Sequence, residues 1–258
     1  MLSDANLCWV VVVAITVRQA KDVYQISARI ENGTFNGKWH FSFDNYYDYD
    51  KTGFGPLKSF NDNLFSPGAS YPVQLRRDFE LVTYCATGEY QFIAEGGKYA
   101  SLKKGWTLMT TMGKGLRYRE VNPRTDMPSR VIQMWFLPGA MGLPPEFIQK
   151  SAEREARTNR FNPIVSNHHH GSLKIHQDVS VYACYLKKEA PLLHQFRARN
   201  AYFYVIEGGP VMLNGREIMP FSAVKIDGEP IIRLEALADA EILMIDMPGK
   251  IVQRKEIR

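Results

Sequence analysis

The stretch that most constrains the fold of this chain runs from residue 67 to residue 88, PGASYPVQLRRDFELVTYCATG. Turn residues at its start lead into residues 73–84, where apolar and polar residues partly alternate and β-forming residues close the run before a glycine. The pattern predicts a strand, a bend and a second strand. Residues 113–120, GKGLRYRE, have the same character. We expect these two stretches to meet in the mouth of a small β-barrel.

Most of the remaining chain also has the pattern of strands. Residues 17–65 are rich in β-formers punctuated by Asn-Gly, Gly and Pro, which is typical of hairpins. Strands are predicted again over residues 90–99 and 101–111, and the apolar run 131–137 (VIQMWFL) predicts one more. The exception is residues 143–161, where two prolines precede a charged segment without glycine. That segment predicts a helix of about 12 residues.

Several motifs resemble the pirin family of the cupin superfamily. The spacing Gly68-x5-Gln74-x-Arg76-x3-Glu80, followed by VTY, resembles the first cupin motif as pirins carry it. Residues 40–62, HFSFDNYYDYDKTGFGPLKSFND, closely resemble the pirin hallmark that begins HSFSFADYYD, and this is the most specific match in the chain. The resemblance extends over nearly the whole chain, since SLKIHQDVSVYACYL in the second half is also similar to a pirin phrase.

The resemblance implies an all-β protein of two stacked antiparallel cupin barrels of the jelly-roll type, a bicupin. A short helical linker would join the two halves. The predicted organisation is an N-terminal extension (1–15), an N-terminal cupin domain (16–142), a helical linker and loop (143–171), a C-terminal cupin domain (172–248) and a basic tail (249–258).

The family resemblance also implies a metal site, from which this sequence departs. Pirins hold one divalent metal, usually iron, on three histidines and one glutamate, and the matching positions here are Gln74, Arg76, Tyr118 and Glu120. Only the glutamate is kept. An amide oxygen is a weak ligand, a phenol must first lose its proton, and a guanidinium is a permanent cation. We therefore expect no metal cofactor, and the alternative is one divalent iron, nickel or manganese ion in a site that is still competent.

Strand alternation places Gln74 and Arg76 on one face of their strand, and Tyr118 and Glu120 on one face of theirs. We predict that Arg76 lies inside the first barrel within salt-bridge reach of Glu120 or Glu80, because a buried carboxylate needs a partner. Two interpretations remain open. The polar groups either cap a closed barrel mouth, or they line a pocket for a small polar or anionic ligand. Basic residues near the rim would help such a pocket, namely Lys114, Arg117 and Arg119.

Three functions follow from these observations. A non-enzymatic pirin-like protein would bind a metabolite or a protein partner, as pirins that act in transcriptional regulation do. The activity implied by the resemblance is instead metal-dependent dioxygenation of flavonols, the quercetin 2,3-dioxygenase reaction. A metal-independent enzyme of the isomerase type would use Glu120 or Tyr118 as acid or base. The first is the preferred hypothesis, because one of four family ligands is left.

Charge and cysteine usage bear on partners and compartment. The excess of 32 Lys and Arg over 27 Asp and Glu is largely a basic C-terminal tail, so direct binding to nucleic acid is not expected. Three widely spaced cysteines without a CxxC motif indicate neither a disulfide framework nor zinc, which fits a reducing compartment. The apolar run Leu7–Ile15 lacks a basic n-region and is too short to span a bilayer. We interpret it as an extra strand or an artefact of start-site choice, and predict a cytoplasmic protein with no membrane association.

The histidines and Cys85 have simple structural interpretations. His168, His169 and His170 precede a glycine and are predicted to form an exposed loop with adventitious metal affinity. His176 is predicted to lie in a strand as a hydrogen-bonded structural residue. Cys85, directly after VTY, is predicted to be buried and slow to react.

Overall fold

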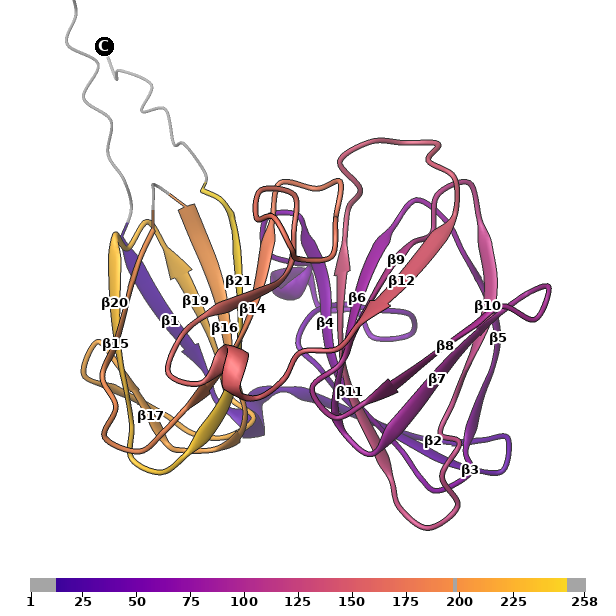
Figure 1. The fold of residues 1–258 in the computed structure, drawn as a ribbon, viewed down its shortest axis with the longest axis horizontal. Helices are drawn as coiled ribbons and strands as arrows, with labels where there is room; N and C mark the ends of the chain where they lie inside the picture. The colour runs from indigo at the N-terminus through magenta and orange to yellow at the C-terminus, as the bar shows by residue number, and fades with distance from the viewer. Residues whose placement is uncertain (1–12, 197–198, 250–258) are drawn as a thin grey trace, which may run out of the picture.

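The computed structural model describes residues 13–196 and 199–249 and is built almost entirely of strands. Two β-bodies lie side by side (Figure 1), and each consists of a large sheet and a four-stranded sheet. We call them the first and second sandwich. The predicted all-β class and two-domain cupin arrangement are confirmed. No sheet closes into a barrel within the described residues.

The first sandwich contains a seven-stranded and a four-stranded antiparallel sheet. The large sheet runs in the order β12 (Glu146–Lys150), β9 (Thr107–Thr111), β6 (Glu80–Thr87), β11 (Ser129–Phe136), β4 (Leu57–Phe65), β3 (Gly33–Trp39) and β2 (Tyr24–Ile30). The small sheet runs in the order β5 (Ser70–Arg76), β10 (Leu116–Val121), β7 (Glu89–Ala94) and β8 (Tyr99–Lys103).

The second sandwich contains a six-stranded and a four-stranded sheet. The large sheet runs in the order β1 (Ala14–Arg18), β19 (Ala223–Asp227), β16 (Arg199–Gly208), β21 (Ala240–Pro248), β14 (Ser180–Leu186) and β13 (Asn162–Ser166). The small sheet runs in the order β15 (Leu192–Gln195), β20 (Ile231–Ala236), β17 (Val211–Leu213) and β18 (Arg216–Ile218). Three 3-10 turns complete the described elements: η1 (Ala20–Asp22), η2 (Tyr49–Lys51) and η3 (Glu155–Arg157).

The chain crosses between the sandwiches near its start. Strand β1 pairs with β19 of the second sandwich, whereas β2 and β3, which follow it, belong to the first (Figure 1). The predicted domain boundary at residue 16 therefore falls inside a strand of the other body. Of the predicted N-terminal segment Leu7–Ile15, residues 7–12 lie outside the described residues, as does the tail from residue 250.

The two large sheets pack against each other through their outer faces. One buried cluster joins Tyr84 and Met134 of the first sandwich to Val181, Tyr204 and other residues of the second, and each sandwich has a further core of its own. Strands β6 and β11 lie between two apolar layers, so both faces of each are buried. This explains why the VIQMWFL run is almost continuously apolar.

The predicted helical linker is wrong. Residues 146–150 form strand β12, which pairs with β9 at the edge of the large sheet, and only the short turn η3 follows. Phe147 packs on the core of the first sandwich while the other four residues of β12 are exposed, as befits a strand at the edge of a sheet. Ladder hydrogen bonds to β9 outweigh the helical propensity of the segment. No helix in the described part of the chain is long and apolar enough to cross a membrane.

Candidate functional site

The candidate site lies on the inner face of the small sheet of the first sandwich. Strand β10 runs between β5 and β7, with Tyr118 opposite Gln74 in the register. A shift in register between Tyr118 and Glu120 brings the carboxylate beside the same amide. Gln74, Tyr118 and Glu120 therefore converge, and the last two are 1% and 4% exposed.

Glu120 is held by three hydrogen-bond donors. Tyr90 Oη donates to Oε1 over 2.6 Å, the side-chain amide of Gln133 donates to the same oxygen, and Gln74 Nε2 donates to Oε2 over 3.3 Å. Gln133 is itself oriented by Asn63, whose amide donates to Gln133 Oε1 over 2.8 Å. Burial raises the pKa of Glu120, and its hydrogen bonds oppose that rise. The carboxylate is thus fully engaged by protein groups.

Arg76 makes its ion pair with a loop residue. Its Nη2 lies 2.9 Å from both carboxylate oxygens of Asp44, and its Nε and Nη2 donate to Gln74 Oε1 over 3.2 and 2.9 Å. The guanidinium also lies over the rings of Phe43 and Trp135, 5.4 and 5.8 Å from their centroids. No ion pair joins Arg76 to Glu120 or Glu80 in the described part of the chain. The predicted direct pairing is wrong. Asp44 supplies the carboxylate that pairs with Arg76, and the Gln74 side chain lies between Arg76 and Glu120.

Tyr118 has an aromatic partner, and its hydroxyl lies close to the Arg76 guanidinium. Its ring stacks on Phe92 with centroids 4.6 Å apart and planes 20° apart. By distance and angle, Oη makes no hydrogen bond among the described residues, although the Arg76 charge is close enough to lower the phenol pKa in part. Burial nevertheless raises the pKa of Tyr118 well above 10, so the phenol keeps its proton.

Glu80, the fifth predicted pocket residue, lies elsewhere. Its fully buried carboxylate accepts hydrogen bonds from the backbone nitrogens of His176 and Gln177 and from His176 Nδ1, at 2.8, 2.9 and 2.9 Å. It therefore joins the first sandwich to the second. His176 lies in a bend and not in the predicted strand, although it is hydrogen-bonded as predicted.

The basic residues predicted for the rim point away from the site. Arg117 and Arg119 alternate with Tyr118 on β10 and are exposed on the outer face of the small sheet. There they border a hollow of about 250 Å³, and Arg117 pairs loosely with Glu95 over 3.7 Å. Lys114 is exposed in the preceding turn. None of the three adds charge to the inner face.

These side chains do not suit a divalent metal. Gln74 uses its carbonyl oxygen to accept from Arg76, Glu120 accepts three hydrogen bonds, and Tyr118 remains a neutral phenol. Arg76, at the remaining family position, adds a fixed positive charge beside them. No group of three or more metal-ligating side chains occurs within the described residues. The arrangement offers hydrogen-bond donors and a partly exposed cation.

Three residues of the site were missed by the sequence analysis. Asp44 lies in the loop after β3 with a positive φ of 45°, which aspartate tolerates better than most residues. Gln133 is the one polar residue in an otherwise apolar run, which is a usable signal for a buried hydrogen-bonded group. Tyr90 carried no distinguishing signal.

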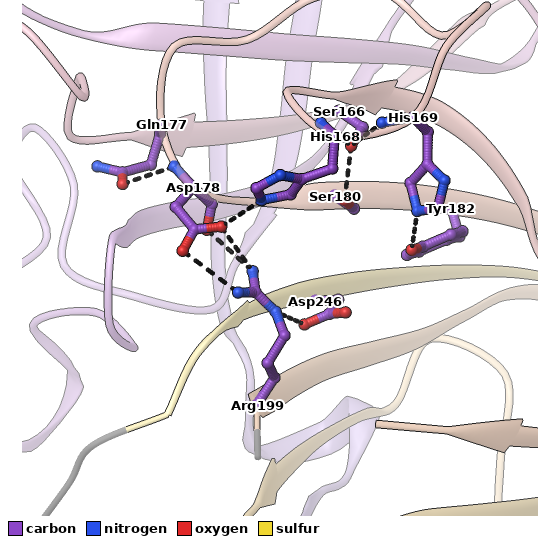
Figure 2. A network of polar contacts seen from close by, with 9 residues as sticks. All are labelled: Ser166, His168, His169, Gln177, Asp178, Ser180, Tyr182, Arg199 and Asp246. Atoms are coloured by element: carbon purple, nitrogen blue, oxygen red, sulfur yellow. Dashed lines mark hydrogen bonds and ion pairs between the residues drawn. The ribbon is translucent and has the colours of Figure 1, made fainter. Parts of the chain in front are cut away.

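The consecutive histidines join a separate polar network in the second sandwich (Figure 2). His168 Nε2 lies 2.7 Å from Asp178, and Arg199 bridges Asp178 to Asp246. His169 Nε2 lies 2.9 Å from Tyr182 Oη. The loop is exposed as predicted, but its first two histidines are hydrogen-bonded to strand and loop residues.

The family comparisons agree with this geometry at the level of fold. Residues 22–136 match the family described as Pirin, and residues 164–247 match the quercetinase C-terminal cupin domain. A quercetin 2,3-dioxygenase of Escherichia coli strain K12 is 29% identical over 212 residues, covering 81% of this chain and 90% of that protein. A pirin-like protein of Caulobacter vibrioides is 26% identical over 218 residues, covering 84% of this chain and 94% of the relative.

Solved structures show the same similarity. The crystal structure of YhhW from Escherichia coli matches with a TM-score of 0.84 and 27% identity, covering 94% of this chain and 100% of that one. A second structure, described as bacterial pirin YhhW in complex with nickel(II), matches with a TM-score of 0.82 and 27% identity over 92% of this chain and 100% of that one.

Proposed function

This chain belongs to the pirin family, and from that premise we propose that it is a metal-free bicupin that binds a small molecule or a protein partner and does not catalyse dioxygenation. The family positions for metal ligands would serve here as a polar recognition site. We further propose that it acts in the cytoplasm, without direct contact to nucleic acid or membrane.

One observation carries the proposal: a hydrogen-bonded chain that runs from Asp44 through Arg76 and Gln74 to Glu120. The Gln74 amide is oriented by both neighbours, since its oxygen accepts from Arg76 and its nitrogen donates to Glu120. Rotating the amide to offer its oxygen to a metal beside Glu120 would break both contacts. The polar side chains of the site thus satisfy one another's hydrogen bonds without a metal.

The same series of hydrogen-bonded side chains supports binding of a small polar or anionic ligand. The Arg76 side chain lies over two aromatic rings and is 27% exposed. Part of its guanidinium is therefore accessible to solvent. The Tyr118 hydroxyl lies beside the Arg76 guanidinium, has no geometrically good hydrogen bond among the described residues, and can donate its proton to a ligand oxygen. A ligand that bears an oxygen acceptor would therefore meet a cation and a neutral donor on adjacent strands.

Elemental analysis of purified, tag-free protein after mild chelation tests the proposal. We expect no stoichiometric iron, nickel, manganese or zinc. As a positive control, the triple variant Gln74→His, Arg76→His, Tyr118→His restores three histidines beside Glu120, and it should take up one divalent metal per chain. One metal per chain in the unmodified protein, lost in Glu120→Ala, would overturn the proposal.

The alternative is a metal-dependent dioxygenase of the quercetin 2,3-dioxygenase type, with iron, nickel or manganese. It is favoured by the names of relatives such as the Escherichia coli protein. Oxygen consumption with quercetin and each added metal separates the two functions. Turnover that depends on Glu120 would establish the alternative, whereas the proposed function predicts none above a metal-only control.

A further inference from the structure

A cavity of about 280 Å³ lies where the chain crosses from the first sandwich to the second, away from the site described above. The crossing segment follows β12, contains the turn η3 and leads into β13 (Figure 1). The cavity is lined by residues of this segment together with Thr107 of β9, Ile164 of β13 and His170 of the loop that follows β13. Both sandwiches therefore contribute to its wall.

Thr107 brings a buried hydroxyl without a protein partner to this cavity. The residue is 1% exposed, and its Oγ1 makes no hydrogen bond among the described residues. Alternation along β9 turns Thr107 to the same side as Met109, which packs in the cluster between the sandwiches. A buried hydroxyl without a partner costs free energy, and a ligand that supplies the missing hydrogen bond recovers that cost.

A buried ion pair lies beside Thr107 and holds the crossing segment in place. Arg157 Nη2 of η3 lies 3.0 Å from Glu241 Oε1 of β21. The hydroxyl of Tyr84, which stands opposite Thr107 in the β6–β9 register, donates to the same carboxylate oxygen. Arg157 Nη1 also donates over 2.6 Å to the backbone oxygen of Ala152, a lining residue. This wall is thus formed by compensated charges and is fixed by contacts to both sandwiches.

The rest of the lining is largely apolar and carries no excess of charge. One cation, Lys150, and one carboxylate, Glu153, are found among its described residues, so their formal charges cancel. Lys150 Nζ already donates to the backbone oxygen of Gly171. The apolar wall is formed by Ala152, Ala156, Pro163 and Ile164. Such a lining favours a neutral ligand, because an ion would lose its hydration without gaining an opposite charge.

Two further polar side chains border the cavity. His170 is the third of the consecutive histidines, and unlike the first two its side chain makes no hydrogen bond within the described part of the chain. The half-buried amide of Asn162 is likewise without a side-chain hydrogen bond there. An amide and a hydroxyl can each both donate and accept, so Asn162 and Thr107 suit a ligand group that does the same.

We propose that this cavity binds a small neutral alcohol with an apolar ring or branched chain. An apolar cavity of about 150 Å³ is enough to hold benzene. A volume of about 280 Å³ therefore admits a six-membered ring together with its hydroxyl. The hydroxyl would exchange hydrogen bonds with Thr107, and the ring would contact the apolar wall. This site goes beyond the proposed function and shares no residue with the hydrogen-bonded side chains around Glu120, so either proposal can fail alone.

Titration of the full chain with cyclohexanol, followed by two-dimensional amide NMR, tests the proposal. We expect saturable binding with a Kd on the order of 1 mM, with shifts of the backbone amides of Ala156 and His170. Thr107→Val keeps the shape and removes the hydroxyl, so it should weaken binding about fivefold, whereas Thr107→Ser should bind within about twofold of the natural protein. Ala156→Leu fills part of the cavity and should weaken binding at least about tenfold.

Matched controls separate this site from general effects. Thr110→Val removes another buried hydroxyl without a partner from the opposite face of β9, and it should leave the Kd unchanged within about twofold. Cyclohexylammonium and cyclohexanecarboxylate have the same ring with a charge, and each should bind at least about tenfold more weakly than cyclohexanol. If Thr107→Val does not fold, Ala156→Leu and the charged analogues decide. The proposal is overturned if cyclohexanol shows no saturable binding, if Thr110→Val weakens binding as much as Thr107→Val, or if a charged analogue binds as tightly.

Discussion

Arg76, which stands at a family metal-ligand position, forms its ion pair with Asp44, and its Nη2 lies 2.9 Å from both oxygens of that carboxylate. The two residues are 32 positions apart in the sequence, one on β5 and one in the loop after β3. Glu120 is left to neutral donors. The charge of Arg76 is therefore balanced by a residue outside the four family positions.

A double-mutant cycle on Arg76 and Asp44 should give a positive coupling energy. Arg76→Ala alone leaves a half-buried carboxylate without its cation, and we expect a loss of about 1 kcal/mol in the free energy of unfolding, part of which Asp44→Asn recovers. Urea unfolding of the four proteins measures it. The pair of Arg76→Ala with Glu120→Gln should instead show coupling below that of the Asp44 cycle, since Gln74 intervenes. Equal coupling in both cycles would contradict the observed pairing.

Glu120 should make the protein respond to pH in a defined direction. Its folded pKa is raised above the ordinary value of 4.5 by burial. A raised pKa means that the folded state holds the proton more tightly, so the stabilising contribution is present at low pH and is lost as pH rises through the folded pKa. The free energy of unfolding of the natural protein, relative to Glu120→Gln, should thus increase as pH falls from 7 toward 4.5. Urea unfolding at several pH values measures this difference, and a flat or falling difference would contradict it.

Cys85 and Cys184 should react slowly with thiol reagents. Both are buried and free, and burial raises the pKa of each thiol to about 12, so little thiolate forms at pH 8. We expect labelling of the native protein by a chromogenic disulfide reagent to be at least 100-fold slower than in guanidinium chloride. Cys8 lies outside the described residues and is replaced by serine for this measurement. Rapid labelling of Cys85 in the folded Cys8→Ser protein would point instead to a redox-sensitive thiol.

Glu80 should matter for the junction of the sandwiches. Its carboxylate has no exposure and accepts three N–H groups of the second sandwich, so Glu80→Ala leaves buried donors without an acceptor. We expect a loss of about 3 kcal/mol in the free energy of unfolding. Glu95→Ala, which removes only a loose surface ion pair with Arg117, should change it by less than about 0.5 kcal/mol. Similar effects of the two variants would show that Glu80 does not connect the bodies.

The sequence by itself determined the β class of this protein and the residues that share a strand face. Turn residues and alternation mark strands locally, so the pattern around residues 67–88 predicts β5 and β6, and alternation places Gln74 and Arg76 together. The pirin-like segments were equally visible, because they are contiguous.

Only the tertiary structure decided what those side chains contact. Glu80 finds donors 96 and 97 positions away, and its face of β6 is set by the packing of the second sandwich, which no local pattern encodes. Residues 146–150 became a strand because β9 offered an open sheet edge, and not because of their own propensity. Alternation determines the direction of a side chain, but the partner it meets depends on long-range packing.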